Sequence, residues 1–317
     1  MLMRSRPKSA GCVNHHGALA VKDGHLRNCR GEPVALAGMS LFWSQWAGRF
    51  YTEAWINRLV REWKVDIVRA AIGVGPDGYL VNPHRERDKL WRVIDAAIAA
   101  GIYLIADWHS SNRHTDEASA CFAEIARRYA SAPNILYETW NEPGRDDWVA
   151  TVRPHHQAVI DALRAYDPDA VVICGTPSQC RDIEVATQFP IDRDNVCYAL
   201  HFYAGTHRQG LRDRADAALR SGVCVFVTEY GLAEADGDGV VDIAEATRWW
   251  RFLEKHGVSY VNWSFFDKPE ACSALVQNKG LRRMFSSHRL SVSGRAVFRH
   301  LRHRSVELAP AKAAIDC

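Results

Sequence analysis

Short apolar runs alternate with longer amphipathic segments along most of this 317-residue chain. When a helix follows a strand, it carries the chain back so that the next strand can pair in parallel with the first. This alternation is therefore typical of a parallel sheet covered by helices. Eight strands are predicted, at residues 34–37, 67–71, 102–106, 135–137, 170–174, 196–200, 224–227 and 259–263.

Eight helical patterns lie between and after these runs, at 52–63, 88–100, 117–129, 147–166, 181–188, 211–221, 242–256 and 293–303. Eight strands and eight helices in alternation predict a single α/β domain, a (β/α)₈ TIM barrel, over residues 16–305. Gly101, Gly222 and Gly257 mark helix ends just before the next strand, as C-terminal glycines do.

The segments that flank the barrel are interpreted separately. LAVKDGHLRN has alternating apolar positions around Asp23-Gly24, which predicts a short β-hairpin with a type I′ turn that closes the barrel floor. Residues 1–15 are polar and basic and are expected to be flexible, and the Ala/Pro-rich residues 306–317 are expected to form a C-terminal tail.

Composition excludes several classes of function. The formal charge is only +3, from 40 Lys+Arg against 37 Asp+Glu, which gives no electrostatic reason to expect a nucleic-acid partner. No apolar run approaches the roughly 18–20 residues that a membrane helix needs, so no membrane partner is expected. The nine cysteines form no CxxC pair and no Cys/His metal spacing, so no metal is predicted.

Polar residues gather where the predicted strands end. In a barrel of this kind the active site is built at the C-terminal ends of the strands. Each of these residues alone has a structural explanation, such as an ion pair or a helix-terminal acid, but together they indicate one site. They are Arg69, Asp107, His109, Asn141, Glu142, His201, Tyr203, Glu229 and Trp263.

Two carboxylates on different strands, without a phosphate-binding glycine loop, favour acid/base and nucleophilic work on an acetal, as in glycoside hydrolysis. A divalent-metal hydrolase that uses Asp107, His109 and His201 is a weaker alternative, because no HxH pattern accompanies them. A non-catalytic carbohydrate-binding barrel is the alternative from a different class.

Seven stretches in order carry a family resemblance: VALAGMSLFWSQW, IVRAAIGV, YLIADWH, ILYETWNEP, YALHFYAGTHRQGLRD, FVTEYG and YVNWSFFDK. The chain resembles the retaining glycoside hydrolases of family 5, and within them the cellulases. The resemblance implies a retaining endo-β-1,4-glucanase that binds β-1,4-linked glucan, needs no cofactor and acts as a monomer. It also implies secretion, although no signal peptide is visible; mannan, xyloglucan and mixed-linkage glucan remain alternative substrates.

The resemblance also implies roles at the reacting centre. Glu142, in NEP, resembles the acid/base, and Glu229, in TEYG, resembles the nucleophile. Asn141 would bind the sugar 2-hydroxyl. Arg69 would keep Glu229 ionised, since an adjacent cation lowers the pKa of a carboxylate, and Tyr203 would orient it.

Further positions resemble the family's sugar-binding groups. His109 and His201 resemble its sugar-binding and acid-orienting histidines, and Trp263 resembles the platform beneath the reacting sugar. Trp46 would stack on a distal sugar on the non-reducing side, where Lys268 would donate to hydroxyls.

Two positions depart from the family pattern. Phe42 stands where many members have a histidine, and Pro177 stands where many have a tryptophan that stacks on the leaving-group side. The leaving-group side is therefore expected to hold glucan more loosely. For Trp43, Trp108 and Trp140, core packing and substrate contact are equally open.

Overall fold

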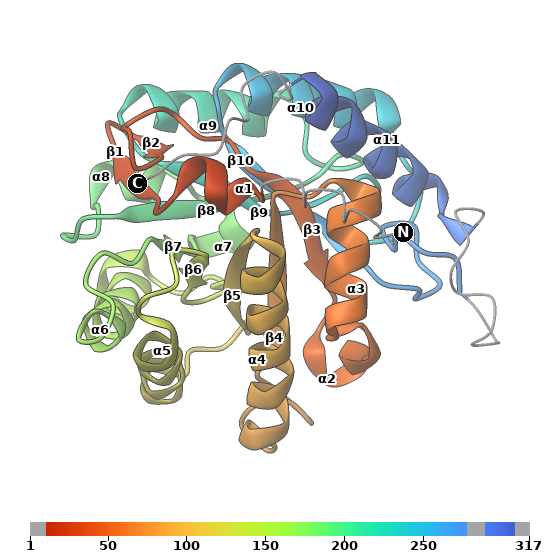
Figure 1. Ribbon diagram of the computed structural model, residues 1–317. Helices are drawn as coiled ribbons and strands as arrows, with labels where there is room; N and C mark the ends of the chain where they lie inside the picture. Colours follow the sequence, from red (N-terminus) through yellow and green to blue (C-terminus); the bar gives the residue numbers. More distant parts are fainter. Residues whose placement is uncertain (1–10, 278–288, 308–317) are drawn as a thin grey trace.

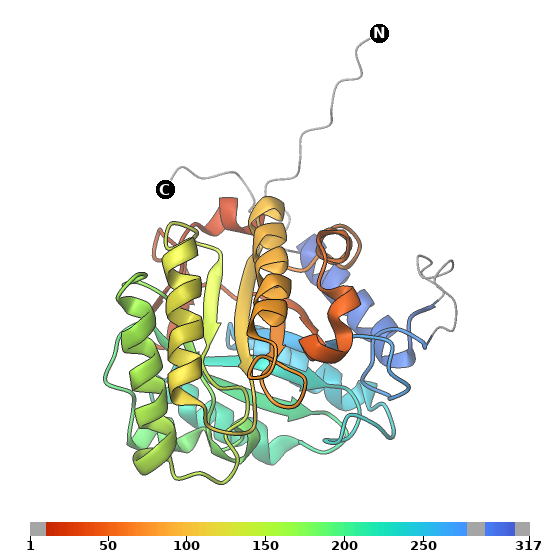
Figure 2. The same cartoon turned by 90° about the horizontal axis from the view of Figure 1, so that it is seen from below.

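The computed structural model of the chain describes residues 11–277 and 289–307; the expectations for residues 1–10 and 308–317 lie outside this range. Eight parallel strands close into a barrel in chain order, with the last paired to the first, and helices surround them (Figures 1 and 2). The predicted TIM barrel is confirmed. Its strands are β3 (Ala37–Leu41), β4 (Ile67–Gly73), β5 (Tyr103–His109), β6 (Ile135–Glu138), β7 (Val172–Cys174), β8 (Val196–Tyr203), β9 (Val225–Gly231) and β10 (Ser259–Phe265).

Helices fill the connections. The long ones are α4 (Pro83–Ala100), α5 (Thr115–Tyr129), α6 (Arg153–Arg164), α9 (Gln209–Arg220), α10 (Ile243–Lys255) and α11 (Val292–Glu307). The short ones are α2 (Ser44–Ala47), η1 (Gly48–Phe50), α3 (Glu53–Arg58), α7 (Pro177–Cys180) and α8 (Glu184–Gln188). Two predicted helices contain a π-helical turn, η2 (Leu59–Trp63) after α3 and η3 (Trp148–Val152) before α6. Within the described ranges, no helix combines the length and the apolar character needed to cross a membrane.

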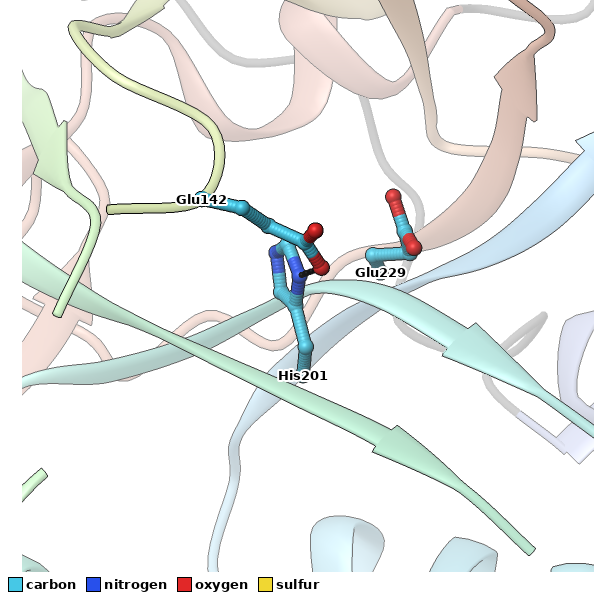
Figure 3. Close-up of side chains that lie close together, drawn as sticks. All are labelled: Glu142, His201 and Glu229. Carbon is cyan, nitrogen blue, oxygen red and sulfur yellow. Dashed lines mark hydrogen bonds and ion pairs between the residues drawn. The ribbon is translucent and has the colours of Figure 1, made fainter. Parts of the chain in front are cut away.

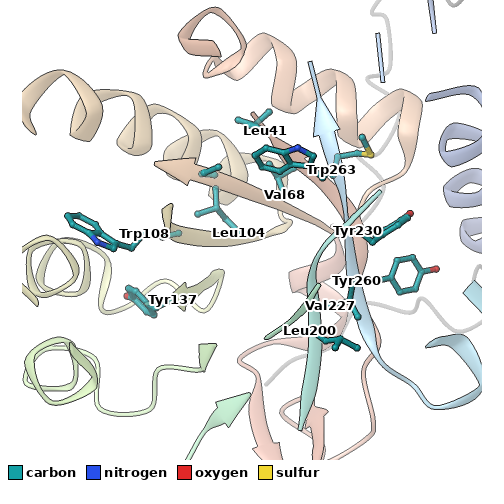
Figure 4. Packing of buried hydrophobic residues seen from close by; sticks show 14 of the residues in the cluster. Leu41, Val68, Leu104, Trp108, Tyr137, Leu200, Val227, Tyr230, Tyr260 and Trp263 are labelled. Carbon is teal, nitrogen blue, oxygen red and sulfur yellow. The ribbon is translucent and has the colours of Figure 1, made fainter. Parts of the chain in front are cut away.

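The helices attach through one amphipathic face. In α10 the side chains of Ala246, Trp249, Trp250 and Leu253 are buried, and Asp242 caps the helix by accepting the amide N–H of Glu245 at 2.9 Å. Such faces pack against the outward side chains of the strands, which form the main apolar cluster shown in Figure 4.

Inside the barrel, side chains of alternate residues point inward and their character changes along each strand. Ile67 of β4, and Tyr103 and Ile105 of β5, belong to an apolar cluster at the floor. Two residues further along each strand, the buried Arg69 and Asp107 replace them. The interior is therefore apolar at the floor and ionic at the mouth.

The predicted hairpin is present. β1 (Ala20–Lys22) and β2 (His25–Arg27) pair antiparallel, and positive φ angles at Asp23 (51°) and Gly24 (73°) fit the type I′ turn. Leu26 belongs to the same apolar cluster as the inward-facing strand residues, so the hairpin closes the floor.

Part of the expected flexible N-terminal segment has regular structure. Cys12–His16 form α1, whose Val13 N–H donates to the carbonyl of Gly101 at 2.9 Å. Cys12 and Val13 join the floor cluster, and this burial gives the helix a reason to form.

The strand bounds differ from the predicted ones in a consistent way. The first strand begins at Ala37, where the predicted run ends, because Val34 and Leu36 are buried in the floor cluster instead. Most others extend toward the mouth and include the polar residues that were expected to follow them, such as His109 in β5 and Tyr203 in β8.

Two glycines with positive φ angles test the contact between the hairpin and Gly222. Gly24 and Gly31 both have positive φ, 73° and 78°, but a Cβ on Gly24 would lie 2.8 Å from the carbonyl oxygen of Gly222, whereas a Cβ on Gly31 would meet nothing within 4 Å. We expect Gly31→Ala to lower the free energy of unfolding by about 1 kcal/mol through strain, and Gly24→Ala by about 2–3 kcal/mol. Urea unfolding of both variants measures this; equal losses would contradict the contact.

Candidate active site

Arg69 of β4 lies at the centre of the barrel mouth with no exposed surface. Its Nε and Nη2 donate to Glu138 at 2.6 and 3.2 Å, and its Nη1 donates to Glu229 at 3.2 Å. Its Nη2 also lies 3.0 Å from a carboxylate oxygen of Asp107 and donates to the side-chain oxygen of Asn141. One guanidinium thus joins groups carried by β5, β6, β9 and the loop that follows β6.

The fully buried Glu138 was not among the predicted site residues. Burial alone would raise its pKa, but the charge of Arg69, the His201 imidazole 3.9 Å away and the hydrogen bonds from Arg69 lower it to about 2. The sequence does hold a signal: a carboxylate inside the apolar run ILYE requires a buried cationic partner.

Glu229 ends the apolar part of β9 and receives two donors. Besides Arg69, the phenol of Tyr203 donates to its second oxygen at 2.6 Å. Burial and the neighbouring Glu229 raise the pKa of Tyr203 well above its ordinary value, so the phenol keeps its proton. This arrangement suits a carboxylate that is held in one orientation.

Glu142 has a different environment. Its side chain is 23% exposed, and one oxygen lies 2.9 Å from Nδ1 of His201 (Figure 3). Nε2 of His201 donates to the hydroxyl of Thr228 at 2.9 Å, and this hydroxyl donates to Glu138 at 2.7 Å. Because ionised Glu138 only accepts, the chain of donors fixes a proton on Nε2 of His201.

The Glu142–His201 contact therefore holds one further proton between two groups. Burial disfavours the imidazolium, but Cys180 and the carboxylates of Glu138 and Glu142 outweigh it and raise the pKa of His201 well above its ordinary value. The pair titrates as a unit and stores a proton beside the exposed oxygen of Glu142.

The two carboxylates that the sequence singled out face each other across one pocket. Oxygens of Glu142 and Glu229 lie within 4.8 Å of one another. Both residues line a pocket of about 170 Å³, together with Gln179, Arg181, His201, Tyr203, His207 and Ala235. Retaining glycosidases hold their carboxyl groups about 5–5.5 Å apart, whereas inverting ones hold them about 6.5–9.5 Å apart, so facing oxygens within 4.8 Å of one another fit the shorter separation.

The same cluster does not suit a metal ion. Glu142, His201 and Glu229 each have a ligand atom within 4.8 Å of the others. However, both nitrogens of His201 are engaged, with Glu142 and with Thr228, so no imidazole lone pair is directed at a common centre. Asp107 and His109 bind each other instead, through Oδ2 and Nδ1 at 2.6 Å.

His109 and Trp263 form a stacked pair at the mouth. Their ring centroids are 5.1 Å apart and their planes differ by 6°. Burial and Arg69 lower the pKa of His109 to about 3, so its imidazole is neutral. The guanidinium carbon of Arg69 lies 5.9 Å from the Trp263 ring, which places the predicted platform directly beside the ionic centre.

An aromatic group extends from this pair along the loop after β3. Trp46 is 54% exposed, with its ring 5.3 Å from Trp43 and 6.3 Å from Phe42. The Lys268 amine lies 5.8 Å from the Phe42 ring and pairs with Glu270. The predicted distal contacts therefore share one side of the mouth.

Two of the three tryptophans whose role was open, Trp108 and Trp140, belong to the core. Trp108 is buried against Tyr79 and Phe122, and Trp140 is buried against His155. For these two, core packing is the correct alternative, whereas Trp43 packs edge-on against His109 at 4.2 Å at the rim of the site.

A closed parallel barrel with two facing carboxylates at its mouth defines the class of retaining-type glycoside hydrolases. Residues 28–269 match the family described as Cellulase (glycosyl hydrolase family 5). The chain belongs to this family.

Relatives and solved structures agree with this assignment. The chain is 44% identical to Endoglucanase Z of Dickeya dadantii over 245 residues, covering 75% of this chain and 58% of that protein. It is 38% identical to Endoglucanase N of Pectobacterium atrosepticum over 300 residues, covering 93% and 67%. The crystal structure of the catalytic domain of Thermobifida fusca endoglucanase Cel5A superposes with a TM-score of 0.87 at 32% identity, covering 92% of this chain and all of that one. The chain thus spans about three fifths to two thirds of the full length of these two relatives.

Substitution of Arg69 tests how much this cation contributes to the free energy of unfolding. Arg69→Met would leave Asp107, Glu138 and Glu229 buried without their cation, and we expect the free energy of unfolding to fall by about 3–5 kcal/mol. The control Arg127→Met, at an exposed position of α5, should change it by no more than about 0.5 kcal/mol. Urea unfolding measures both, and a loss at Arg69 no larger than the control would refute the central role.

The shared proton predicts a pH effect. Because the pKa of His201 is raised, the pair keeps its proton as pH rises until it passes that elevated value, and the alkaline limb of kcat/KM lies there. In His201→Asn, Glu142 loses its partner, so we expect this limb to move to lower pH and kcat to fall about 10–100-fold. The pH profile of the surface variant His256→Asn is the control; an unmoved limb in His201→Asn would contradict the shared proton.

Proposed function

We propose that the protein is an endo-β-1,4-glucanase that hydrolyses internal bonds of cellulose or soluble β-glucan with retention, with Glu142 as acid/base and Glu229 as nucleophile. The observation that carries the proposal is the pair of carboxylates within 4.8 Å, of which one is held by Arg69 and Tyr203 and the other shares a proton with His201. Different environments for two carboxyl groups are what acid and nucleophile roles require.

The first step breaks the glycosidic bond. A carboxylate oxygen of Glu229 attacks the anomeric carbon, and the bond from that carbon to the leaving oxygen breaks as the Glu142–His201 pair delivers its proton to the oxygen. Arg69 and Tyr203 orient the attacking carboxylate. The product is a glycosyl ester on Glu229, and the leaving sugar departs with a free hydroxyl.

The second step restores the enzyme. The Glu142–His201 pair, now short of one proton, takes one from a water molecule whose oxygen attacks the anomeric carbon and displaces Glu229. Two inversions give net retention. Asn141 uses its amide oxygen to accept from Arg69, which leaves its N–H groups to donate to the sugar 2-hydroxyl, a contact that strengthens in the transition state.

The relatives support the substrate class. The named relatives are endoglucanases, and a variant of the Thermobifida fusca catalytic domain has been solved in complex with cellotetraose. We assign Trp263 as sugar platform, the exposed Trp46 as distal stacking surface, and His109 and Lys268 as polar contacts on the aromatic side of the mouth. Action as a monomer outside the cell, where a polymeric substrate is found, is part of the proposal.

Two other functions are distinguishable from this one. Mannan, xyloglucan and mixed-linkage glucan use the same reacting groups, so activity on a substrate panel separates them. A non-catalytic binding barrel would need no proton shared by Glu142 and His201, and it predicts oligosaccharide binding without turnover.

Substitution of each carboxylate tests the assigned roles. We expect Glu142→Gln and Glu229→Gln each to lower reducing-end release from carboxymethyl cellulose by about 10³-fold or more, equivalent to about 4 kcal/mol of transition-state stabilisation. Glu117→Gln, at an exposed position of α5, is the matched control with unchanged activity.

Azide distinguishes the two roles. With a good leaving group, azide should rescue Glu142→Ala and give a β-glycosyl azide, because the ester on Glu229 still forms. It should rescue Glu229→Ala with an α-glycosyl azide, because azide then attacks the substrate directly. Exchanged stereochemistry would mean that the roles are reversed, and unimpaired Gln variants would mean that the site is wrongly assigned.

A further inference from the structure

The pocket that holds the reacting carboxylates extends to residues outside the aromatic group. Its lining includes Gln179, Arg181 and His207, and none of the exposed aromatic residues of the β3 loop. Pro177, which stands where a stacking tryptophan was expected, begins the short helix α7 that carries Gln179. The leaving-group side is therefore lined by hydrogen-bonding groups.

A left-handed turn presents these groups. Ser178, Gln179 and Cys180 have φ angles of 57°, 54° and 58°, although none is glycine, and such a residue costs about 1–2 kcal/mol each. The turn is bound to the loop of Glu142: the Ser178 N–H donates to Gly144 at 2.6 Å, the Gln179 N–H to Pro143 at 3.1 Å, and the Cys180 thiol to the Asn141 carbonyl at 3.0 Å. Strained backbone held by several contacts is typical of functional sites.

Two N–H donors, on Arg181 and His207, approach each other in this part of the pocket with no acceptor between them. The Tyr203 N–H donates to Nδ1 of His207 at 2.8 Å. Burial, Arg181 and His201 lower the pKa of His207 to about 4, so its imidazole is neutral and carries its proton on Nε2. Nη1 of Arg181 lies 3.5 Å from this Nε2, and because both are donors the contact is no hydrogen bond. A shared acceptor oxygen would satisfy both.

The charge of Arg181 is also uncompensated. Its Nε donates to the Ser178 carbonyl and its Nη2 to the Gln179 side-chain oxygen, both at 2.6 Å and both neutral acceptors. In the described part of the chain no carboxylate forms an ion pair with Arg181. The acids that follow it, Asp182 and Glu184, bind Arg214 at 2.9 and 2.7 Å.

We propose that Arg181, His207 and Gln179 form a leaving-group subsite that binds a carboxylate-bearing sugar unit, so that the enzyme prefers acidic glucan over neutral glucan at this position. The proposal rests on the proposed glucanase function and names its substrate class more narrowly. A carboxylate adds Coulomb attraction to the guanidinium and accepts short, charge-assisted hydrogen bonds from it, whereas a neutral hydroxyl brings no opposite charge, which gives the preference its physical basis. Glu142 and Glu229 repel a second carboxylate at the inner end of the pocket, so the acidic group would lie at the outer end.

The test compares kcat/KM on carboxymethyl cellulose and on neutral hydroxyethyl cellulose. We expect Arg181→Gln to lower the carboxymethyl-to-hydroxyethyl ratio about 5–10-fold and Arg181→Lys to retain most of it, since lysine keeps the charge but not the bond to Ser178. Arg127→Gln, which removes one exposed charge from α5, should leave the ratio unchanged. The wild-type ratio should fall toward that of Arg181→Gln in 0.5 M NaCl.

The position of carboxymethyl groups at the ends of the products gives a second measurement. Mass spectrometry of the leaving-group fragments from carboxymethyl cellulose should find substituted units enriched at their new non-reducing ends with wild type and depleted with Arg181→Gln. Equal ratios for wild type and Arg181→Gln, or equal losses in the Gln and Lys variants, would overturn the subsite. If wild type cleaves neither polymer, the glucanase proposal itself fails, an outcome distinct from cleavage without preference.

Discussion

The guanidinium of Arg69, buried among carboxylates, is the interaction on which the mouth of the barrel depends. It contacts Asp107, Glu138 and Glu229, so three strands besides its own converge on one charge. Burying any of these ions alone would cost several kcal/mol, and only their mutual pairing makes the arrangement tolerable. The same pairing fixes the position and the direction of the Glu229 carboxylate.

The two ends of the barrel differ in role: the floor is apolar and stabilises the fold, and the mouth holds the polar groups of the site. At the floor, the hairpin and α1 cover apolar residues such as Ile67 and Ile105, which supplies hydrophobic stabilisation. At the mouth, buried polar groups hold one another in place, and the hydroxyl of Thr228 is an example because it links His201 to Glu138. A rigid apolar floor allows a polar mouth to be held in one geometry.

The sequence predicted the strands well because short apolar runs that alternate with amphipathic helical patterns indicate buried parallel strands. It placed Arg69, Glu142 and Glu229 together because barrel topology brings strand ends to one face. Glu138 was missed because it is embedded in an apolar run. The start of β3 was predicted too early because Val34 and Leu36 are apolar and buried in the floor cluster, although they lie before the strand. Such burial depends on contacts across the barrel, which local patterns do not contain.

The left-handed turn at Ser178–Cys180 shows the same limit most clearly. Serine, glutamine and cysteine have no intrinsic preference for positive φ, so nothing local in PSQC indicates the turn. It exists because the carbonyls of Asn141, Pro143 and Gly144 are presented to it by the neighbouring loop. The loop that carries Glu142 and the turn at residues 178–180 are consequently one hydrogen-bonded unit. In the proposed mechanism, a substrate group that binds Arg181 would be coupled to the position of Glu142, because recognition at Arg181 and proton delivery by Glu142 would act through the same short segment.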